Sequence, residues 1–189
     1  MQTDVSLRWR DSIAPLARVP WPFIARVCVA ASVACGLLAL YRDSSFAHPN
    51  LARGKAATAS SRAFGTEPSG AVDGNRYGQL GFHSAEEREP WLVIDLERRT
   101  RLDRITVFGR ADCCFEQSLP LVVEVSDDGA TFRTIGERTA PFTQYQPWVL
   151  RPKSAPIARF LRLRTTRRSF LVVSEVEVRG EYVTTTIEK

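Results

Sequence analysis

The chain has few of the residues on which enzymes most often depend. Its 189 residues include one methionine, four cysteines and two histidines, His48 and His83. A serine–histidine–aspartate site would have to use His83, and no Gly-x-Ser-x-Gly stretch accompanies it. Redox sites usually carry Cys-x-x-Cys, whereas two of the cysteines here are adjacent. We therefore expect a protein that is not an enzyme.

The sequence also has no block of basic residues. Its net charge is +5, and the arginines are spread along the chain. Nucleic-acid binding usually needs a basic stripe, often with interleaved aromatic residues, so we expect no nucleic-acid partner. The 44% hydrophobic and 25% charged residues are typical of a globular protein, and the length suffices for one domain plus a tail or anchor.

No uninterrupted apolar run reaches the roughly 20 residues that a transmembrane helix needs. The longest, residues 27–41, follows the basic N-terminal residues 1–26, and this charge order keeps the N-terminus in the cytoplasm and sends the rest of the chain across the membrane. Residues 27–41 are then a hydrophobic helix that acts as an uncleaved signal anchor. Alternatively, they are the apolar region of a signal peptide that is cleaved after Ala47.

Both alternatives export the remainder of the chain, beyond a linker at residues 42–49. The anchor gives a single-pass protein of the cell membrane with its C-terminal domain outside, and cleavage gives a secreted or periplasmic protein. Cys28 and Cys35 lie within the apolar run and are expected to be small packing residues. Because disulfides persist in oxidising compartments, Cys113 and Cys114 are the cysteines that matter for the exported domain.

The exported region shows β-strand patterns and no extended helical period. Apolar residues alternate with others in residues 90–96, 101–110, 120–137, 158–165 and 171–180. The run 120–137 contains the turn signal Asp-Asp-Gly at residues 127–129. We predict an all-β sandwich or barrel over residues 50–182 with a tail at residues 183–189. The glycine-rich residues 50–90 supply the long loops where binding usually occurs.

Several arginines take the outward positions of these strands. The alternation places Arg104 and Arg110 opposite the apolar face of the run 101–110. Arg162 and Arg164 alternate with leucines in the same manner, and we expect them on a solvated face.

Cys113 and Cys114 make a poor cross-link. Neighbouring Cα atoms lie about 3.8 Å apart, whereas disulfides typically need about 4.4–6.8 Å. A bond between them would close almost no loop and would add little stability. It would instead provide a rigid apolar knob at the end of a strand, and the alternative is two free thiols.

Polar residues around the cysteines suit a sugar. Arg110 and His83 offer donors for hydroxyl and ring oxygens, and Asp112 can hold the arginine in place. The alternative for Arg110 and Asp112 is an ordinary surface ion pair, worth less than about 1 kcal/mol.

Six short segments, in order, carry a family resemblance. They are NLARGKAATASS, AVDGN, FHS, PWLVIDL, SDDGATF and VSEVEV, between Asn50 and Glu181. Together they resemble the coagulation-factor type C, or discoidin, family. The resemblance implies a jelly-roll β-sandwich with a galactose-binding-like fold.

Within that family, GRADCCFEQ at residues 109–117 resembles the fucolectin-type lectins, in which an Arg-x-Asp-Cys-Cys-x-Glu pattern with a vicinal disulfide forms a fucose site beside an upstream histidine. This implies a non-catalytic carbohydrate-binding module for a sugar of fucose or galactose type. The implied binding residues are His83, Arg110, Asp112, Cys113, Cys114 and Gln117. His83 and Arg110 would bond sugar hydroxyls, Asp112 would orient Arg110, and the Cys113–Cys114 disulfide would form an apolar platform. Gln117 stands where the lectins carry a second basic residue, and it can donate a bond but brings no charge.

The resemblance further implies a structural calcium ion near the Asp-Gly-Asn turn. Asp73 and Glu175 would provide side-chain ligands, and Gly70 and Asn75 would provide carbonyl oxygens. Calcium takes 6–8 oxygen ligands, and a tight loop supplies carbonyls readily. The alternative is that Asp73 and Gly74 form only a turn.

Two alternative functions remain for this fold. One is adhesion to phospholipid or protein, as in the coagulation-factor members, which needs exposed apolar side chains on loops; Phe64, Tyr77 and Phe82 are the candidates. The other is a domain that keeps the fold while its site has lapsed, an alternative that Gln117 leaves open.

Overall fold

A computed structural model describes residues 49–78 and 80–184 of the protein. The predicted helix at residues 27–41, most of the linker and the end of the tail lie outside the described residues. Among the residues that are described, no helix is long and apolar enough to cross a membrane.

The described chain is almost entirely strand and loop, so the all-β prediction is confirmed. Its one helical segment is the five-residue 3-10 helix η2 (Pro68–Val72). The strands are β1 (Ala57–Ala59), β2 (Phe82–His83), β3 (Glu87–Arg88), β4 (Trp91–Phe108), β5 (Leu121–Ser126), β6 (Arg133–Arg138), β7 (Trp148–Leu150), β8 (Ile157–Thr165), β9 (Arg168–Ser169), β10 (Val172–Val173) and β11 (Glu175–Tyr182). The turn predicted at residues 127–129 joins β5 to β6.

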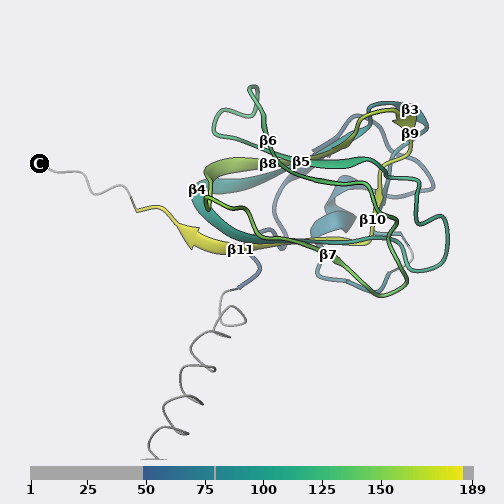
Figure 1. Ribbon diagram of the computed structural model, residues 1–189, viewed down its shortest axis with the longest axis horizontal. Helices are drawn as coiled ribbons and strands as arrows, with labels where there is room; N and C mark the ends of the chain where they lie inside the picture. The colour runs from purple at the N-terminus through teal and green to yellow at the C-terminus, as the bar shows by residue number, and fades with distance from the viewer. Residues whose placement is uncertain (1–48, 79, 185–189) are drawn as a thin grey trace, which may run out of the picture. The chain divides into compact units, whose positions relative to one another are not determined.

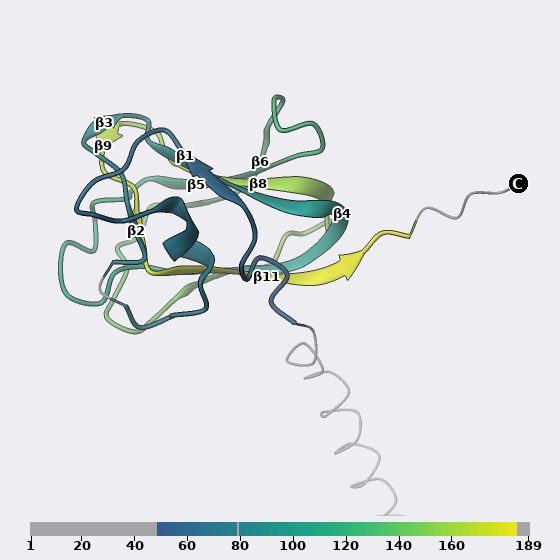
Figure 2. The same ribbon diagram turned by 180° about the vertical axis from the view of Figure 1, so that it is seen from behind.

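Strand β4 is common to the two layers of the sandwich, and Figures 1 and 2 show it curving from one layer into the other. Its first part pairs with β1 and β8, which continue the layer through β5 to β6. Its second part pairs with β11 and β7. The alternating pattern predicts two strands here, at 90–96 and 101–110. The structure joins them, with a register irregularity between Asp95 and Thr100 in place of a turn.

The core lies between the two layers. Leu92, Ile94 and Leu96 of β4 are fully buried and alternate with more exposed neighbours, as predicted. On β11, Val176 and Val178 are also fully buried. Because strand side chains alternate between faces, Glu175, Glu177 and Arg179 occupy the opposite face of β11. That face meets loops and carries the polar contacts described below.

The prediction of a simple solvated face at Arg162 and Arg164 is wrong. Both are half-buried and donate hydrogen bonds to the carboxylate of Glu124, at 2.6 Å and 3.1 Å. Glu124 itself is buried on the neighbouring strand β5, so it needs charged partners to offset its lost hydration.

Strands β3, β9 and β10 lie at the end of the sandwich away from the bend in β4 (Figures 1 and 2). Here β2 pairs with β10, in a register that sets His83 opposite Val172. The predicted strand 171–180 is interrupted at Ser174, whose hydroxyl donates to the Gly78 carbonyl at 2.6 Å and lies 3.1 Å from that of Gly109. Ser174 thus ties the loop before β2 to the loop after β4.

Candidate functional site

The cysteine pair lies in the loop that follows β4. The prediction that Arg110 lies on the outward face of a strand is wrong, because β4 ends at Phe108. The Arg110 side chain is instead only 14% exposed and lies within the loop that it helps to shape.

Arg110 is held by a two-pronged ion pair. Its Nε and Nη2 donate to the two carboxylate oxygens of Asp112, each at 2.7 Å, and its Nη1 donates to Oε1 of Gln117 at 3.1 Å. The hydrogen bonds from Arg110 lower the pKa of Asp112 to about 2, and Asp112 in turn raises the pKa of Arg110. A guanidinium has five N–H donors, so three of them are used here and two remain for a ligand.

Cys113 and Cys114 form a disulfide with their Cα atoms 3.8 Å apart, so the structure favours the bonded pair over free thiols. Cys114 has a φ of +59°, a left-handed conformation that is uncommon outside glycine. Cys114 is exposed and Cys113 is half-buried. The disulfide therefore presents an apolar surface to solvent next to Arg110.

The segment before and within β10 fixes this loop. The Val172 N–H donates to the Ser118 hydroxyl at 2.8 Å, and that hydroxyl donates to the Val172 carbonyl at 3.1 Å. The Ser169 hydroxyl also bonds the Gln117 carbonyl. These contacts connect the cysteine loop to the strand pair that carries His83.

His83 is buried. Its Nδ1 lies 2.7 Å from the Ser84 carbonyl, which can only accept, so Nδ1 carries the proton and Nε2 is an acceptor. Burial lowers the pKa of His83, and the positive charge of Arg110 lowers it further. His83 was predicted to offer a donor, whereas this geometry leaves it an acceptor for a hydroxyl group.

Aromatic side chains around His83 are part of the site that sequence analysis misses. Phe64 and Phe170 contact the His83 ring with centroid separations of 4.5 Å and 5.3 Å. Phe64, which sequence analysis assigns to adhesion, is 72% exposed. Phe82 was an adhesion candidate as well, but that prediction is wrong because its side chain is fully buried in the core. A strand of two residues, such as β2, is too short for an alternating pattern in the sequence to show that Phe82 is buried.

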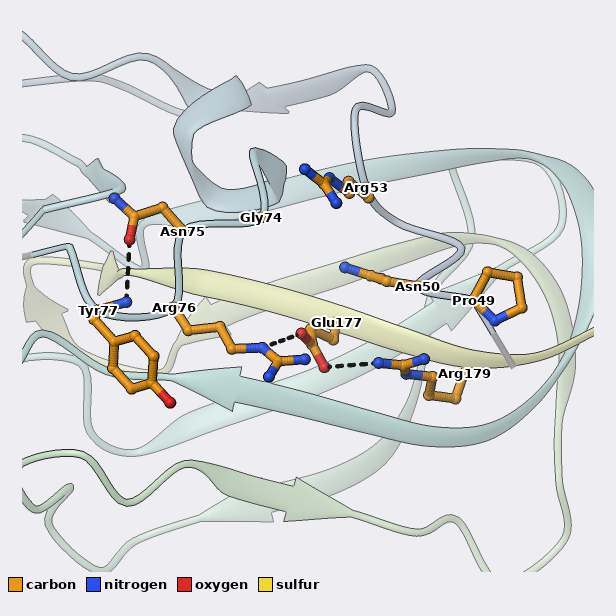
Figure 3. A pocket seen from close by; sticks show the side chains of 9 residues that line it. All are labelled: Pro49, Asn50, Arg53, Gly74, Asn75, Arg76, Tyr77, Glu177 and Arg179. Atoms are coloured by element: carbon orange, nitrogen blue, oxygen red, sulfur yellow. Dashed lines mark hydrogen bonds and ion pairs between the residues drawn. The ribbon is translucent and has the colours of Figure 1, made fainter. Parts of the chain in front are cut away.

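The Asp-Gly-Asn turn is a separate feature on the outer face of β11. The Asn75 N–H donates to the Asp73 carboxylate at 2.7 Å, which closes the turn. Gly74 has a φ of +95°, a backbone conformation that favours glycine, and the Arg53 guanidinium packs over the space that a Cβ would take. As Figure 3 shows, residues of this turn line one side of a cleft whose other side includes Asn50 and β11.

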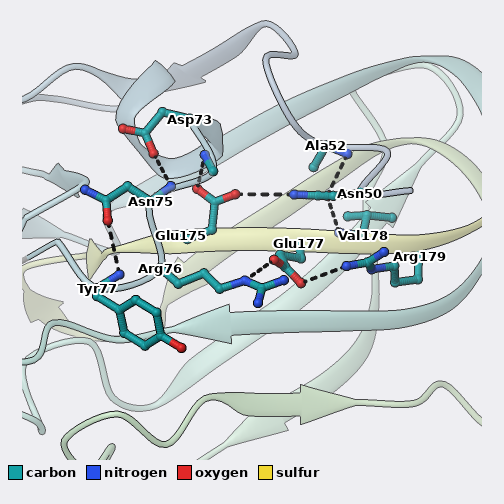
Figure 4. A network of polar contacts seen from close by, with 11 residues as sticks. Asn50, Ala52, Asp73, Asn75, Arg76, Tyr77, Glu175, Glu177, Val178 and Arg179 are labelled. Atoms are coloured by element: carbon teal, nitrogen blue, oxygen red, sulfur yellow. Dashed lines mark hydrogen bonds and ion pairs between the residues drawn. The ribbon is translucent and has the colours of Figure 1, made fainter. Parts of the chain in front are cut away.

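Glu175 is buried beneath this turn (Figure 4). One of its oxygens accepts from the Gly74 N–H at 3.1 Å and the other from the Asn50 amide at 3.3 Å. Burial raises the pKa of Glu175 to about 7, and the negative charge of Asp73 adds to that shift. Within residues 49–78 and 80–184, no group of three or more His, Cys, Asp or Glu side chains could hold a metal ion. A cation here would therefore depend on backbone carbonyls in addition to Asp73 and Glu175.

The sequence pattern of the F5/8 type C domain matches residues 56–176 of this chain. A comparison with curated proteins gives no match.

Solved structures of sugar-binding proteins are similar in fold. A fucose-binding module of Streptococcus pneumoniae is 24% identical with a TM-score of 0.62, and the alignment covers 71% of this chain and 96% of the module. A fucolectin from striped bass (Morone saxatilis) serum is 22% identical with a TM-score of 0.67, covering 74% of this chain and 51% of the lectin. The lectin domain of lectinolysin, complexed with Lewis B antigen, is 24% identical with a TM-score of 0.58, covering 69% and 95%. These similarities confirm the galactose-binding-like jelly roll.

Proposed function

Because this chain belongs to the F5/8 type C domain family, we propose that it is a non-catalytic module that binds carbohydrate outside the cytoplasmic membrane. The observation that carries the proposal is the Arg110–Asp112 fork beside the Cys113–Cys114 disulfide. His83 lies on the strand that pairs with β10, and β10 is bonded to the same loop through Ser118. The similar structures include a fucose-binding module and a lectin domain complexed with Lewis B antigen, which supports a ligand of this class.

The chemistry of the site matches a sugar. The two remaining N–H groups of Arg110 donate to hydroxyl or ring oxygens, and Nε2 of His83 accepts from a hydroxyl. The exposed disulfide is a rigid apolar surface for the C–H face of a sugar ring. Gln117 keeps an amide NH₂ for donation, because its oxygen already accepts from Arg110. We propose a fucose- or galactose-type ligand on this basis.

A glycan-array screen of the purified full-length chain tests the proposal. We expect binding to fucose- or galactose-bearing glycans by the oxidised protein and loss of that binding after reduction, because reduction removes the platform. Circular dichroism of the reduced sample controls for unfolding, which should be slight since this disulfide closes almost no loop. No binding by folded, oxidised protein would reject the lectin function and favour adhesion or a lapsed site.

We also propose that Asp73, Glu175 and the carbonyls of Gly70 and Asn75 hold a structural calcium ion. The supporting observation is that Glu175 is buried with two neutral donors while the carboxylate of Asp73 is near enough to raise its pKa. Two anions in such a place favour a cation between them, and calcium prefers carboxylate and carbonyl oxygens. Bound calcium would neutralise the pair and stabilise the turn.

Melting curves test the calcium proposal. The folded-state pKa of Glu175, about 7, lies above its usual 4.5. In the calcium-free protein, Glu175 therefore makes its full contribution to folding stability below about pH 4.5. That contribution is lost as the pH rises through about 7. We expect the melting temperature with chelator to fall by several degrees from about pH 5 to about pH 8, and calcium to restore it at the higher pH.

The variant Glu175→Gln isolates this effect from His83 and other titrating groups, because glutamine stays neutral at every pH. The melting temperature of Glu175→Gln should show neither the additional fall at high pH nor the rise on addition of calcium. If the wild-type melting temperature at about pH 8 is the same with chelator and with calcium, the chain holds no structural calcium ion.

The location is part of the same proposal. Residues 27–41 would tether the domain as a signal anchor, or would be removed with a signal peptide. A tethered array would compensate for the weak affinity that is usual for shallow sugar sites, since several modules can engage one surface.

A further inference from the structure

A basic cleft lies beside the Asp-Gly-Asn turn, on residues that the proposed sugar site does not use (Figure 3). It is lined by Pro49, Asn50, Arg53, Gly74, Asn75, Arg76, Tyr77, Glu177 and Arg179. Three arginines and one glutamate are the charged residues of this lining, which gives a net charge of +2. A concave site with an excess of one sign concentrates ligands of the opposite sign.

Glu177 on β11 accounts for only part of that positive charge. Its carboxylate accepts from Nε of Arg76 at 2.5 Å and lies 3.5 Å from Nη2 of Arg179 (Figure 4). One carboxylate is thus shared by two guanidinium groups. These ion pairs hold the two arginines in fixed positions along the floor of the cleft.

Arg53 supplies the additional charge from the opposite wall. It is exposed, and within the described residues no hydrogen bond or ion pair engages its guanidinium. The guanidinium packs over Gly74, whose missing side chain makes room for it. An arginine that is positioned by packing and not neutralised by a carboxylate is well suited to grip an oxyanion in two-pronged fashion.

Exposed aromatic rings lie at one end of the cleft. Tyr77 lines it and is 68% exposed, and its ring meets that of Tyr145, which is 64% exposed, with centroids 6.3 Å apart. A tyrosine ring offers an apolar face with a polar tip, which suits the mixed surface of a sugar ring.

We propose that this cleft is a second ligand site, for a sugar residue that carries an acidic group, either a carboxylate or a sulfate. Arg53 and the floor arginines bind the acidic group, and Tyr77 contacts the ring of the same or the neighbouring sugar. The cleft is concave and its charges lie inside it, so it fits a discrete anionic group better than the flat surface of a bilayer. The site shares no residue with the fork and disulfide of the first site and does not depend on it.

Titration of the purified full-length chain with matched sugars tests the proposal. The probes are glucuronic acid against glucose, galacturonic acid against galactose, and galactose 6-sulfate, followed by NMR or calorimetry. We expect the three acidic sugars to bind and their affinity to fall as sodium chloride is added. Measurement in the Arg110→Ala variant separates this site from the first, and binding of acidic sugars there should be unchanged.

Three variants make the test specific. Arg53→Gln should weaken binding of acidic sugars about tenfold or more, because a charge-assisted contact is lost. Glu177→Gln should strengthen binding of acidic sugars, because the Glu177 carboxylate no longer competes with the ligand for Arg76 and Arg179. Arg133→Gln, on the exposed face of β6, removes the same charge away from the cleft and should change the affinity less than about twofold.

Three results would overturn the proposal. Equal affinities for acidic and neutral sugars would show that the cleft does not distinguish charged from neutral ligands. Equal losses in Arg53→Gln and Arg133→Gln would reduce the effect to overall charge. Arg53-dependent binding to phosphatidylserine vesicles, without binding to the acidic sugars, would replace the sugar with a lipid headgroup.

Discussion

Replacement of Arg110 by alanine is expected to abolish detectable sugar binding while leaving the domain folded. The variant removes both remaining donors to the ligand and frees Asp112 and Gln117 from the geometry that Arg110 imposes. Two charge-assisted hydrogen bonds are worth roughly 3 kcal/mol or more together, which is about a hundredfold or more in affinity. A loss of this size places the affinity of an already weak site below detection. The measurement is retention on immobilised fucose and galactose.

The stability of this variant follows from exposure. Asp112 is 30% exposed, so water can solvate its carboxylate once Arg110 is gone, and we expect a loss of only about 1 kcal/mol. Arg99→Ala is the matched control, because Arg99 forms the same two-pronged pair with Asp127 on an exposed turn. Arg99→Ala should bind sugar normally. Normal binding by Arg110→Ala would mean that the sugar site lies elsewhere.

The parts of the structure that sequence analysis predicts are those that depend on local pattern. Alternation identified the buried faces at Leu92 and Leu163, and the Asp-Asp-Gly signal identified the turn after β5. The adjacent cysteines and the arginine before them are a contiguous motif, so their proximity needs no tertiary information. The family resemblance then supplied the jelly-roll architecture.

The parts that sequence analysis misses depend on contacts between distant segments. Arg76 and Glu177 are 101 residues apart, and only the fold reveals that one loop and one strand place them 2.5 Å from each other. The continuity of β4 is another example, because residues 97–99 look like a polar turn until the partner strands are known. Phe82 looked like a loop residue, and its burial is determined by the short pairing of β2 with β10.

Gly81→Ala is expected to cause a large loss of stability. A Cβ at Gly81 would lie 2.1 Å from the Ser174 carbonyl oxygen and 2.6 Å from that of Gly70, and both are backbone atoms. Ser174 cannot shift easily, because its own N–H donates to the Phe108 carbonyl at 2.8 Å. We expect the free energy of unfolding, measured by urea denaturation, to fall by about 3 kcal/mol or more.

Gly78→Ala provides the control for this prediction within the same loop. A Cβ there would approach only the side-chain amide of Asn75, at 3.2 Å, and an exposed side chain can move aside. The free energy of unfolding of Gly78→Ala should fall by less than about 1 kcal/mol. Because Gly81 precedes β2 directly, a shift of its backbone also moves His83 relative to β10, so Gly81→Ala should weaken sugar binding even in the fraction that folds. Equal stabilities for the two variants would show that the Gly70, Gly81 and Ser174 backbones are not in tight contact.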